Sequence, residues 1–225
     1  SSENVFEENF DSDNADSEND FDESIVFENL SINNVGEASG TCGENLTWTL
    51  DEEGTLTISG TGDMEDYSYS PWSSYTVKSV IIEEGVTNIG DYAFFECSNT
   101  SITIPDSVTN IGEAAFYYCT SLTSITIPDS VTYIGDRAFR NCTSLTSITI
   151  HDSVTNIGDY AFYDCDGLTS ITVPDSVTSI GTQAFDYCDN LKSITIGKGV
   201  TYIGDLAFGY NDMVAIQGFT IIGYV

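Results

Sequence analysis

Apolar side chains recur along residues 78–212 with a period of 23 residues, and the polar residues between them keep the same phase. Each period holds an Ile-Gly pair that is followed at a fixed distance by Ala-Phe. The regular pairs begin at Ile111, Ile134, Ile157, Ile180 and Ile203, and Ile89 precedes the first of them by 22 residues instead of 23. A segment of this length cannot bury its apolar side alone, so a core forms only when segments stack. The pattern therefore predicts a solenoid of six coils.

Two short extended pieces are expected in each coil. In residues 122–127, Ile125 and Ile127 alternate with Ser124 and Thr126. Alternation is typical of a strand with one buried face, so the two hydroxyls should point outward from a parallel strand. After a Pro-Asp turn, the apolar residues of segment 131–135 predict a second short extended piece.

The rest of the coil carries apolar residues at helical spacing. Ala138, Phe139, Cys142 and Leu145 recur at intervals that place them on one helix face, so we expect a short helix on the opposite wall. The phenylalanines should stack as a central spine. They are Phe94, Phe116, Phe139, Phe162, Phe185 and Phe208. The predicted fold class is an α/β solenoid with short parallel strands and short helices.

Residues 41–77 precede the coils and have a different pattern. Segments 46–50 and 55–59 alternate apolar and polar residues around Asp51-Glu-Glu-Gly54, which predicts a β-hairpin. Its position suits a cap over the open apolar end of the stack. Trp72, in the loop-like stretch 63–75, is expected to pack on the first coil.

The two ends of the chain are interpreted separately. Residues 1–40 hold 12 acidic residues and no basic ones, which indicates a disordered arm. The alternative is that segment 24–27 pairs with an edge strand. Residues 213–225 resemble the start of a C-terminal unit, and we expect the natural chain to continue beyond Val225.

The net charge of -31, with only five basic residues, restricts the partners. Nucleic acid is excluded because phosphate binding needs clustered Lys and Arg, and an anionic bilayer surface is disfavoured for the same reason. No apolar run approaches about 18 residues, so no membrane insertion is expected. The expected partner is an extracellular protein or a polysaccharide. The sequence leaves the oligomeric state open.

Five of the six cysteines occupy one phase of the repeat, three residues after the phenylalanine. They are Cys97, Cys119, Cys142, Cys165 and Cys188. The column favours a ladder of buried thiols, one per coil. Disulfides between neighbouring rungs are the alternative, although five cysteines cannot all pair. Since no Cys-x-x-Cys pair occurs, no zinc site is expected. The sequence also has no phosphate loop or dinucleotide fingerprint, and no cofactor is expected.

The outward hydroxyls of the strands are the first candidate binding surface. Along a strand the two hydroxyls lie about 7 Å apart, and adjacent rungs lie about 4.8 Å apart. The central members are Ser124, Thr126, Ser147, Thr149, Ser170 and Thr172. Such a lattice suits a polysaccharide or an extended peptide. Alternatively, these residues stabilise the sheet without any ligand.

The second candidate lies just after each phenylalanine, where the coils differ from one another. Its members are Tyr117, Arg140, Tyr163 and Tyr187. Tyr and Arg are frequent anchors of protein interfaces. The alternative is that these side chains simply pack between neighbouring coils.

Aspartates form two further columns, and neither is assigned to metal or catalysis. The columns are Asp106, Asp129, Asp152 and Asp175, and Asp91, Asp136, Asp159 and Asp205. Stacked carboxylates suit calcium, but aspartate in a turn also accepts hydrogen bonds from free backbone N–H groups. The second interpretation is preferred because no Asp-x-Asp-x-Asp-Gly loop occurs. His151 is the only histidine, no catalytic motif is found, and no enzymatic activity is expected.

The coils carry the pattern L-x-S-I-x-I-P-x-S-V-T-x-I-G-x-x-A-F-x-x-C, and segments 40–50 and 55–62 lead into them, so that together they cover about residues 40–222. This pattern resembles the BspA-like (Treponema pallidum-type) class of leucine-rich repeats. His151 takes the place of the usual Pro, and Gly197-Lys-Gly199 replaces Pro-Asp-Ser. The resemblance implies a secreted or surface-attached protein, mostly of host-associated bacteria, that acts in adhesion and protein binding. It supplies no catalytic residues.

The predicted function is therefore an extracellular or cell-surface module for protein binding or adhesion, without catalysis. Two alternatives stay open. One is a rigid acidic spacer for another domain of a longer surface protein. The other is a polysaccharide-binding module.

Overall fold

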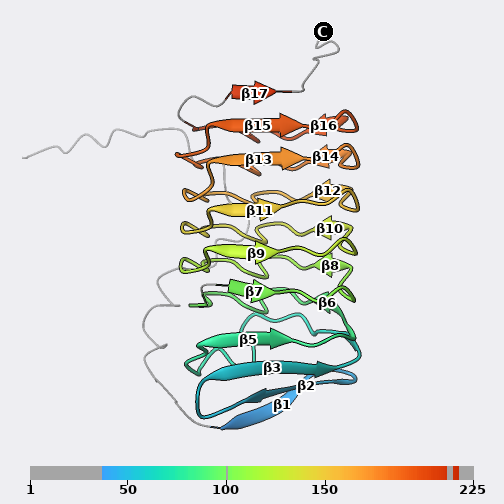
Figure 1. Ribbon diagram of the computed structural model, residues 1–225, viewed down its shortest axis with the longest axis vertical. Helices are drawn as coiled ribbons and strands as arrows, with labels where there is room; N and C mark the ends of the chain where they lie inside the picture. The colour runs from blue at the N-terminus through green and yellow to red at the C-terminus, as the bar shows by residue number, and fades with distance from the viewer. Residues whose placement is uncertain (1–36, 100, 212–214, 218–225) are drawn as a thin grey trace, which may run out of the picture. The chain divides into compact units, whose positions relative to one another are not determined.

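The computed structural model describes residues 37–99, 101–211 and 215–217, all within one compact unit, Asn33–Val225. In this unit successive coils stack on one another, and each coil adds strands to two facing walls (Figure 1). The predicted solenoid is confirmed. The alternative pairing of segment 24–27 and the end segment 218–225 lie outside the described residues.

The first wall runs along the whole stack. Its strands are β1 (Ala38–Gly43), β2 (Leu46–Leu50), β3 (Thr55–Gly60), β5 (Ser79–Ile82), β7 (Ser101–Thr103), β9 (Ser124–Thr126), β11 (Ser147–Thr149), β13 (Ser170–Val173), β15 (Ser193–Ile196) and β17 (Ala215–Gln217). From β3 onward the strands pair in parallel, in the order β3-β5-β7-β9-β11 and then β13-β15-β17. Equivalent residues face each other, as Ser124 and Ser147 do. The hydrophobic alternation therefore fixes one register for all coils.

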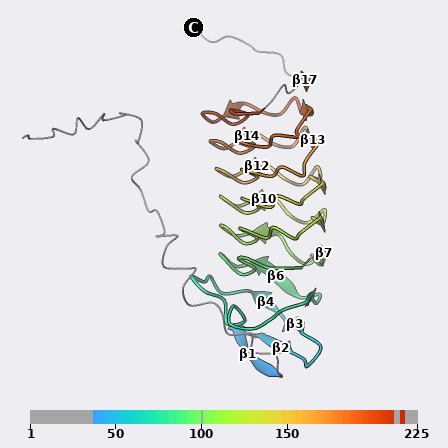
Figure 2. The same cartoon turned by 90° about the vertical axis from the view of Figure 1, so that its left-hand side faces the viewer.

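The second wall consists of shorter strands. They are β4 (Gly62–Asp63), β6 (Val86–Ile89), β8 (Asn110–Ile111), β10 (Tyr133–Ile134), β12 (Asn156–Ile157), β14 (Ser179–Ile180) and β16 (Tyr202–Ile203). They form one parallel sheet in chain order, with Ile134 beside Ile111 and Ile157. Figure 2 shows β13 and β14 on different sides of the stack. The Ile-Gly pair thus ends the second extended piece, as predicted.

Three antiparallel strands precede the coils. The structure contains the predicted hairpin, because β2 pairs with β3 around the turn at residues 51–54. β1 adds a third strand and begins at Ala38, within the segment 1–40 that was predicted as an arm. Trp72 Nε1 donates a hydrogen bond to Ala93 O at 2.9 Å, and its ring stacks on Phe94 with centroids 5.8 Å apart. The expected packing of Trp72 on the first coil is confirmed.

The third side of each coil, here called the turn wall, comprises residues 91–99 and the equivalent later segments. The prediction of short helices there is wrong, because the described residues of the turn wall form tight turns only. Every second N–H donates to a carbonyl of the next coil. In one coil the donors are Ala114, Phe116 and Tyr118, at 2.8 to 2.9 Å. Ala114 and Tyr118 adopt left-handed φ values of 50° and 59°, which turn these N–H groups out of their own segment.

The stacking distance explains why the turn wall is not helical. Strands of adjacent coils lie about 4.8 Å apart, whereas packed helices need about 8–10 Å. On the turn wall, the ring centroids of Phe116 and Phe139 are 5.2 Å apart. Adjacent coils are therefore almost as close here as in the sheets. Tight turns fit this spacing and helices do not.

The phenylalanine spine is confirmed. Successive rings from Phe94 to Phe208 have centroids 5.4, 5.2, 5.3, 5.1 and 5.7 Å apart and lie within 11° of parallel. Isoleucines from both sheets complete the core, and Ile111 and Ile134 are fully buried. The core is thus one continuous column, which each coil extends by one layer.

The cysteine column lies beside this spine, and all six cysteines are free thiols. Cys119, Cys142, Cys165 and Cys188 are buried, and each Sγ lies 3.0 to 3.1 Å from a phenylalanine carbonyl of the preceding coil. Cys97 is half-buried, and its Sγ is 2.8 Å from Cys119 Sγ. The first rung is therefore the rung that solvent reaches.

We expect a thiol alkylating reagent to modify Cys97 before the other cysteines of the reduced, folded protein. Burial raises the pKa of Cys188 to about 12 and that of Cys42 to about 11, so these groups stay neutral and unreactive near pH 8. Intact-mass spectrometry over time measures the labelling, and Cys97→Ser should remove the first addition. Rapid labelling of Cys188 in the folded state would contradict the buried ladder.

Candidate functional site

The first candidate surface, here called the hydroxyl face, is the outer side of β7, β9, β11, β13 and β15. Ser124, Thr126, Ser147, Thr149, Ser170 and Thr172 are all exposed. In β9 and β13 the isoleucine between the two hydroxyls is buried. The hydroxyls therefore point outward in the predicted columns. That they bind a ligand stays a prediction.

The second candidate surface, here called the aromatic edge, follows the rim of the turn wall. It consists of Phe95, Tyr117, Arg140, Tyr163, Tyr187 and Tyr210. Ring centroids are 5.5 Å apart for Phe95–Tyr117, 5.2 Å for Tyr163–Tyr187 and 5.1 Å for Tyr187–Tyr210. Arg140 bridges the remaining gap, because its Cζ lies 5.3 Å from the Tyr117 centroid and 5.0 Å from the Tyr163 centroid. The four residues predicted from the sequence thus belong to one continuous row.

The side chains of the aromatic edge pack against one another and are also exposed in part. Their packing agrees with one interpretation of these residues, and their exposure agrees with the other. Rings touch along the stack at tilts of 36° to 46°. Exposure rises toward the C-terminal end, where Tyr187 is 41% and Tyr210 is 63% exposed. Neighbouring coils thus hold the rings in a fixed row, and much of the surface of the last two rings faces solvent.

In the coil after Tyr163, the equivalent residue is Asp186 rather than an aromatic residue, so a different position of that coil supplies the ring. Asp186 is fully buried and accepts hydrogen bonds from Gln183 Nε2 at 2.8 Å and from the N–H groups of Tyr187 and Tyr210 at 3.0 and 2.5 Å. A buried carboxylate with three donors is well satisfied. The aromatic ring moves to the next residue, so Tyr187 and then Tyr210 are the last rungs among the described residues.

Two contributors to the aromatic edge were not predicted. Tyr160 lies across from Arg140, with its ring centroid 5.7 Å from Cζ. Tyr210 is two residues after Phe208, as Tyr187 is after Phe185, so the repeat phase carried a signal for it. The phase of Tyr160 gave a weaker signal, because it holds a second tyrosine, Tyr92, but in the other coils Ala114, Arg137, Gln183 and Leu206.

Carboxylates make the surroundings of the aromatic edge negative. The pKa of Asp164 is raised by burial and next by the charge of Asp166, although a hydrogen bond from the Asn141 amide opposes the rise. Asp166 also accepts a hydrogen bond from the N–H of Asp189 at 3.2 Å. Three carboxyl groups therefore lie close together, and one of them, Asp164, lies beside Tyr163.

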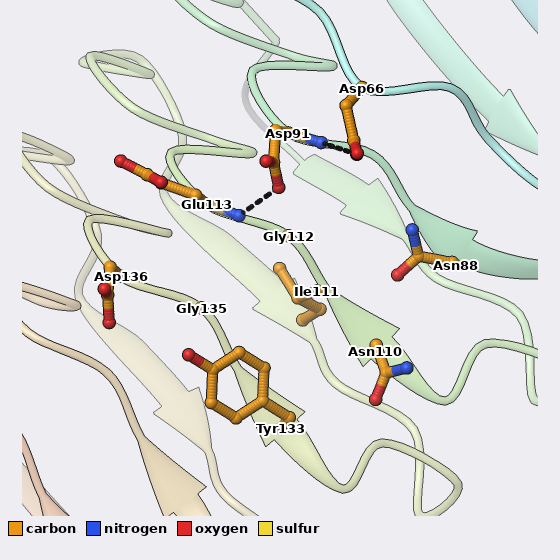
Figure 3. A pocket seen from close by; sticks show the side chains of 10 residues that line it. All are labelled: Asp66, Asn88, Asp91, Asn110, Ile111, Gly112, Glu113, Tyr133, Gly135 and Asp136. Carbon is orange, nitrogen blue, oxygen red and sulfur yellow. Dashed lines mark hydrogen bonds between the residues drawn. The ribbon is translucent and has the colours of Figure 1, made fainter.

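An open pocket of about 440 Å³ lies between the second wall and the turn wall (Figure 3). Asp66 and Asp91 project into it, and their carboxylates accept the N–H groups of Asp91 and Glu113 at 3.0 and 2.7 Å. Burial raises the pKa of Asp91, with a smaller contribution from Asp66. Glu113 binds Arg137 at 2.8 Å instead. The acidic side chains of the pocket thus already serve the stack itself.

The preferred interpretation of the aspartate columns is confirmed where hydrogen bonds are seen. Asp136 accepts the N–H of Asp159 at 2.8 Å, and Asp159 accepts the N–H of Thr182 at 2.6 Å. Asp175 accepts the N–H of Lys198 at 2.7 Å. Each such carboxylate joins its coil to the next one.

The single histidine lies beside an aspartate of the preceding coil. His151 Nδ1 is 2.7 Å from Asp129 Oδ1, and that aspartate is 85% exposed. Within the described ranges, no group of three or more His, Cys, Asp or Glu residues is arranged to hold a metal ion. The same residues contain no helix long and apolar enough to cross a membrane.

The repeat also matches a known family. The family model described as BspA type leucine rich repeat region matches this chain in six copies, over residues 63–120 and 110–222. The chain belongs to this family. A search of the curated proteins gives no match.

Solved structures of bacterial leucine-rich repeat proteins are similar to this chain. The T. pallidum leucine rich repeat protein TpLRR is 26% identical, with 78% of this chain and 85% of that chain covered and a TM-score of 0.53. A leucine-rich repeat protein from Bacteroides ovatus is also 26% identical, with coverages of 76% and 57% and a TM-score of 0.47. A leucine rich cell surface protein from Faecalibacterium prausnitzii is 22% identical, with coverages of 74% and 72% and a TM-score of 0.37. TpLRR supports the leucine-rich repeat solenoid for this chain.

Proposed function

We propose that this chain is an extracellular or cell-surface module that binds a protein partner along the aromatic edge, without catalysis. Family membership supports the binding role, since leucine-rich repeat solenoids generally bind proteins. The observation that carries the proposal is the row of six stacked side chains, exposed at Tyr187 and Tyr210. Large amphipathic rings with little remaining freedom are good interface anchors, because binding orders them at small entropic cost.

In the same proposal, the antiparallel strands β1–β3 cap the first coil. Trp48 and Trp72 contact each other edge to face at 6.0 Å, and Trp72 covers Phe94 at the start of the spine. A solenoid needs such a cap because its terminal coil otherwise exposes an apolar face.

The hydroxyl face supports polysaccharide binding as a second candidate function. Its hydroxyls are exposed in register on successive parallel strands, so they repeat at the spacing of the sheet. A repeating polymer is the ligand that such a row would match. A rigid acidic spacer is the remaining alternative, and it requires neither surface.

An array of extracellular matrix proteins and cell-wall polysaccharides separates these functions. The full chain is compared with an edge variant, Tyr187→Ala/Tyr210→Ala, and a hydroxyl-face variant, Thr126→Ala/Thr149→Ala, at low and physiological salt. We expect a saturable protein partner whose affinity falls at least about ten-fold in the edge variant, as for interface hot spots. The hydroxyl-face variant should bind normally.

Two results would contradict the proposal. Polysaccharide binding that is lost only in the hydroxyl-face variant would transfer the function to the hydroxyl face. No saturable partner at physiological salt would favour the spacer. Circular dichroism of each variant shows whether the fold is intact.

A further inference from the structure

The aromatic edge already contains one bound guanidinium, that of Arg140. Its Cζ lies 5.3, 5.0 and 5.7 Å from the ring centroids of Tyr117, Tyr163 and Tyr160. In other coils the equivalent place holds the ring of Phe95, Tyr117 or Tyr163. The edge therefore accepts a guanidinium as one rung between tyrosine rings.

Three rings surround this guanidinium, and the carboxylate of Asp164 lies near enough to interact with its charge. Arg140 Nε is buried and has no hydrogen-bond partner among the described residues. A flat, weakly hydrated guanidinium gains from lying within about 6 Å of an aromatic face. The chain thus shows, within its own fold, how the edge binds an arginine side chain.

The C-terminal part of the edge has the same spacing, and no cation stacks on its rings among the residues that the structure describes. Tyr187 lies 5.2 Å from Tyr163 and 5.1 Å from Tyr210, close to the distances that Arg140 makes. The sequence has five basic residues, and Arg137 and Arg140 both lie in the middle of the stack. Arg137 is occupied by Glu113 at 2.8 Å and by the Tyr160 ring at 5.4 Å. Neither arginine contacts the exposed rings of Tyr187 and Tyr210.

The charge around these open rings favours a cationic occupant. Asp164 lies beside Tyr163, the ring next to Tyr187 in the row, and the charges of Asp166 and Asp189 add to the burial that raises the pKa of Asp164. The chain as a whole carries a charge of -31. A neutral sugar would stack on the rings and donate hydroxyl groups to carboxylates but would gain nothing from the net negative charge, and an anionic polymer would be repelled.

We propose that Tyr187 and Tyr210, with the neighbouring carboxylates, bind an arginine-bearing basic segment of a partner protein. This inference rests on the proposed binding function and names the partner's chemistry. Guanidinium groups of the partner stack on the two open rings and bond the carboxylates, which extends the pattern that Arg140 begins. Arginine is preferred over lysine because its planar fork both stacks on rings and pairs with carboxylates.

Three short peptides of equal length test the proposal. They alternate serine with arginine, with lysine or with citrulline, the neutral analogue of arginine. Fluorescence anisotropy measures their binding to the full chain at low and at physiological salt. We expect the arginine peptide to bind roughly five- to thirty-fold more tightly than the lysine peptide at physiological salt, and the citrulline peptide not to bind.

Variants then locate the binding. Tyr187→Ala/Tyr210→Ala should remove the preference for arginine over lysine. Tyr202→Ala is the matched control, because Tyr202 is 58% exposed but lies on the second wall in β16. It should bind all three peptides as the unchanged chain does.

Each other result overturns the inference. Equal affinity for the arginine and lysine peptides means that net charge alone attracts them. Absence of arginine-peptide binding, while a protein from the array still depends on Tyr187 and Tyr210, keeps the edge as an interface but rejects a basic partner. The peptide comparison uses the unchanged chain, so it decides even if the double variant does not fold.

Discussion

Replacing Phe139 by alanine is expected to lower the free energy of unfolding by about 3–5 kcal/mol. Phe139 is fully buried and stacks between Phe116 and Phe162, with centroids 5.2 and 5.3 Å away. The turn wall cannot collapse around the cavity, because the Phe139 N–H is bonded to Ala161 O in the next coil at 2.8 Å. Two rings therefore lose a partner face. Chemical unfolding followed by far-ultraviolet circular dichroism measures the loss.

Tyr202→Ala removes a ring of similar size from an exposed position and is the control for this prediction. Tyr202 is 58% exposed, so its loss should cost less than about 1 kcal/mol. Equal effects of the two substitutions would show that the phenylalanine spine does not hold the coils together.

The strand walls and the spine could be predicted because each coil repeats the same pattern of apolar and polar residues. In β9 and β11 the hydroxyls alternate with Ile125 and Ile148. Alternation with a period of two residues is typical of a strand with one buried face. The phenylalanine in each coil has the same phase, and only stacking buries all of them. Repetition thus turns a short, ambiguous pattern into a reliable one.

The turn wall could not be predicted because the spacing of apolar residues does not show whether backbone N–H groups donate within their own segment or to the next coil. Ala138, Phe139 and Cys142 face inward in tight turns as they would in a helix. The distance between coils decides whether this segment forms a helix or tight turns, and that distance depends on all three walls together. Left-handed φ at bulky residues such as Tyr160, at 56°, gave no sequence signal, since such positions normally favour glycine.

The aromatic edge was predicted in part for a similar reason. Tyr117, Tyr163 and Tyr187 were found because they differ between coils. Their order along one rim depends on the turn geometry and on Asp186, whose burial moves the ring by one residue. A buried aspartate with three backbone and side-chain donors cannot be told from an exposed aspartate by sequence alone.

The glycine of each Ile-Gly pair is expected to be as sensitive as the spine. A Cβ on Gly135 would lie 2.6 Å from both the carbonyl carbon and oxygen of Gly112, and 2.8 Å from Ile111 O. These are backbone atoms of the preceding coil and cannot rotate away. The Gly135 N–H also donates to Ile111 O at 2.9 Å, so separating the coils stretches that bond. Gly135→Ala should therefore destabilise by about 3 kcal/mol, the upper end for overpacking.

Gly62→Ala separates crowding from backbone conformation. Gly62 has a φ of 111°, and no atom lies within 4 Å of the position that a Cβ would take, so alanine there meets strain but no clash. Its expected cost is about 1 kcal/mol. Chemical unfolding of both variants gives the comparison. If Gly135→Ala costs no more than Gly62→Ala, the coils can move apart, and close approach is not the reason for a glycine at this place. If it costs more, the separation of the coils is fixed by backbone contact, which is the same constraint that excludes helices from the turn wall.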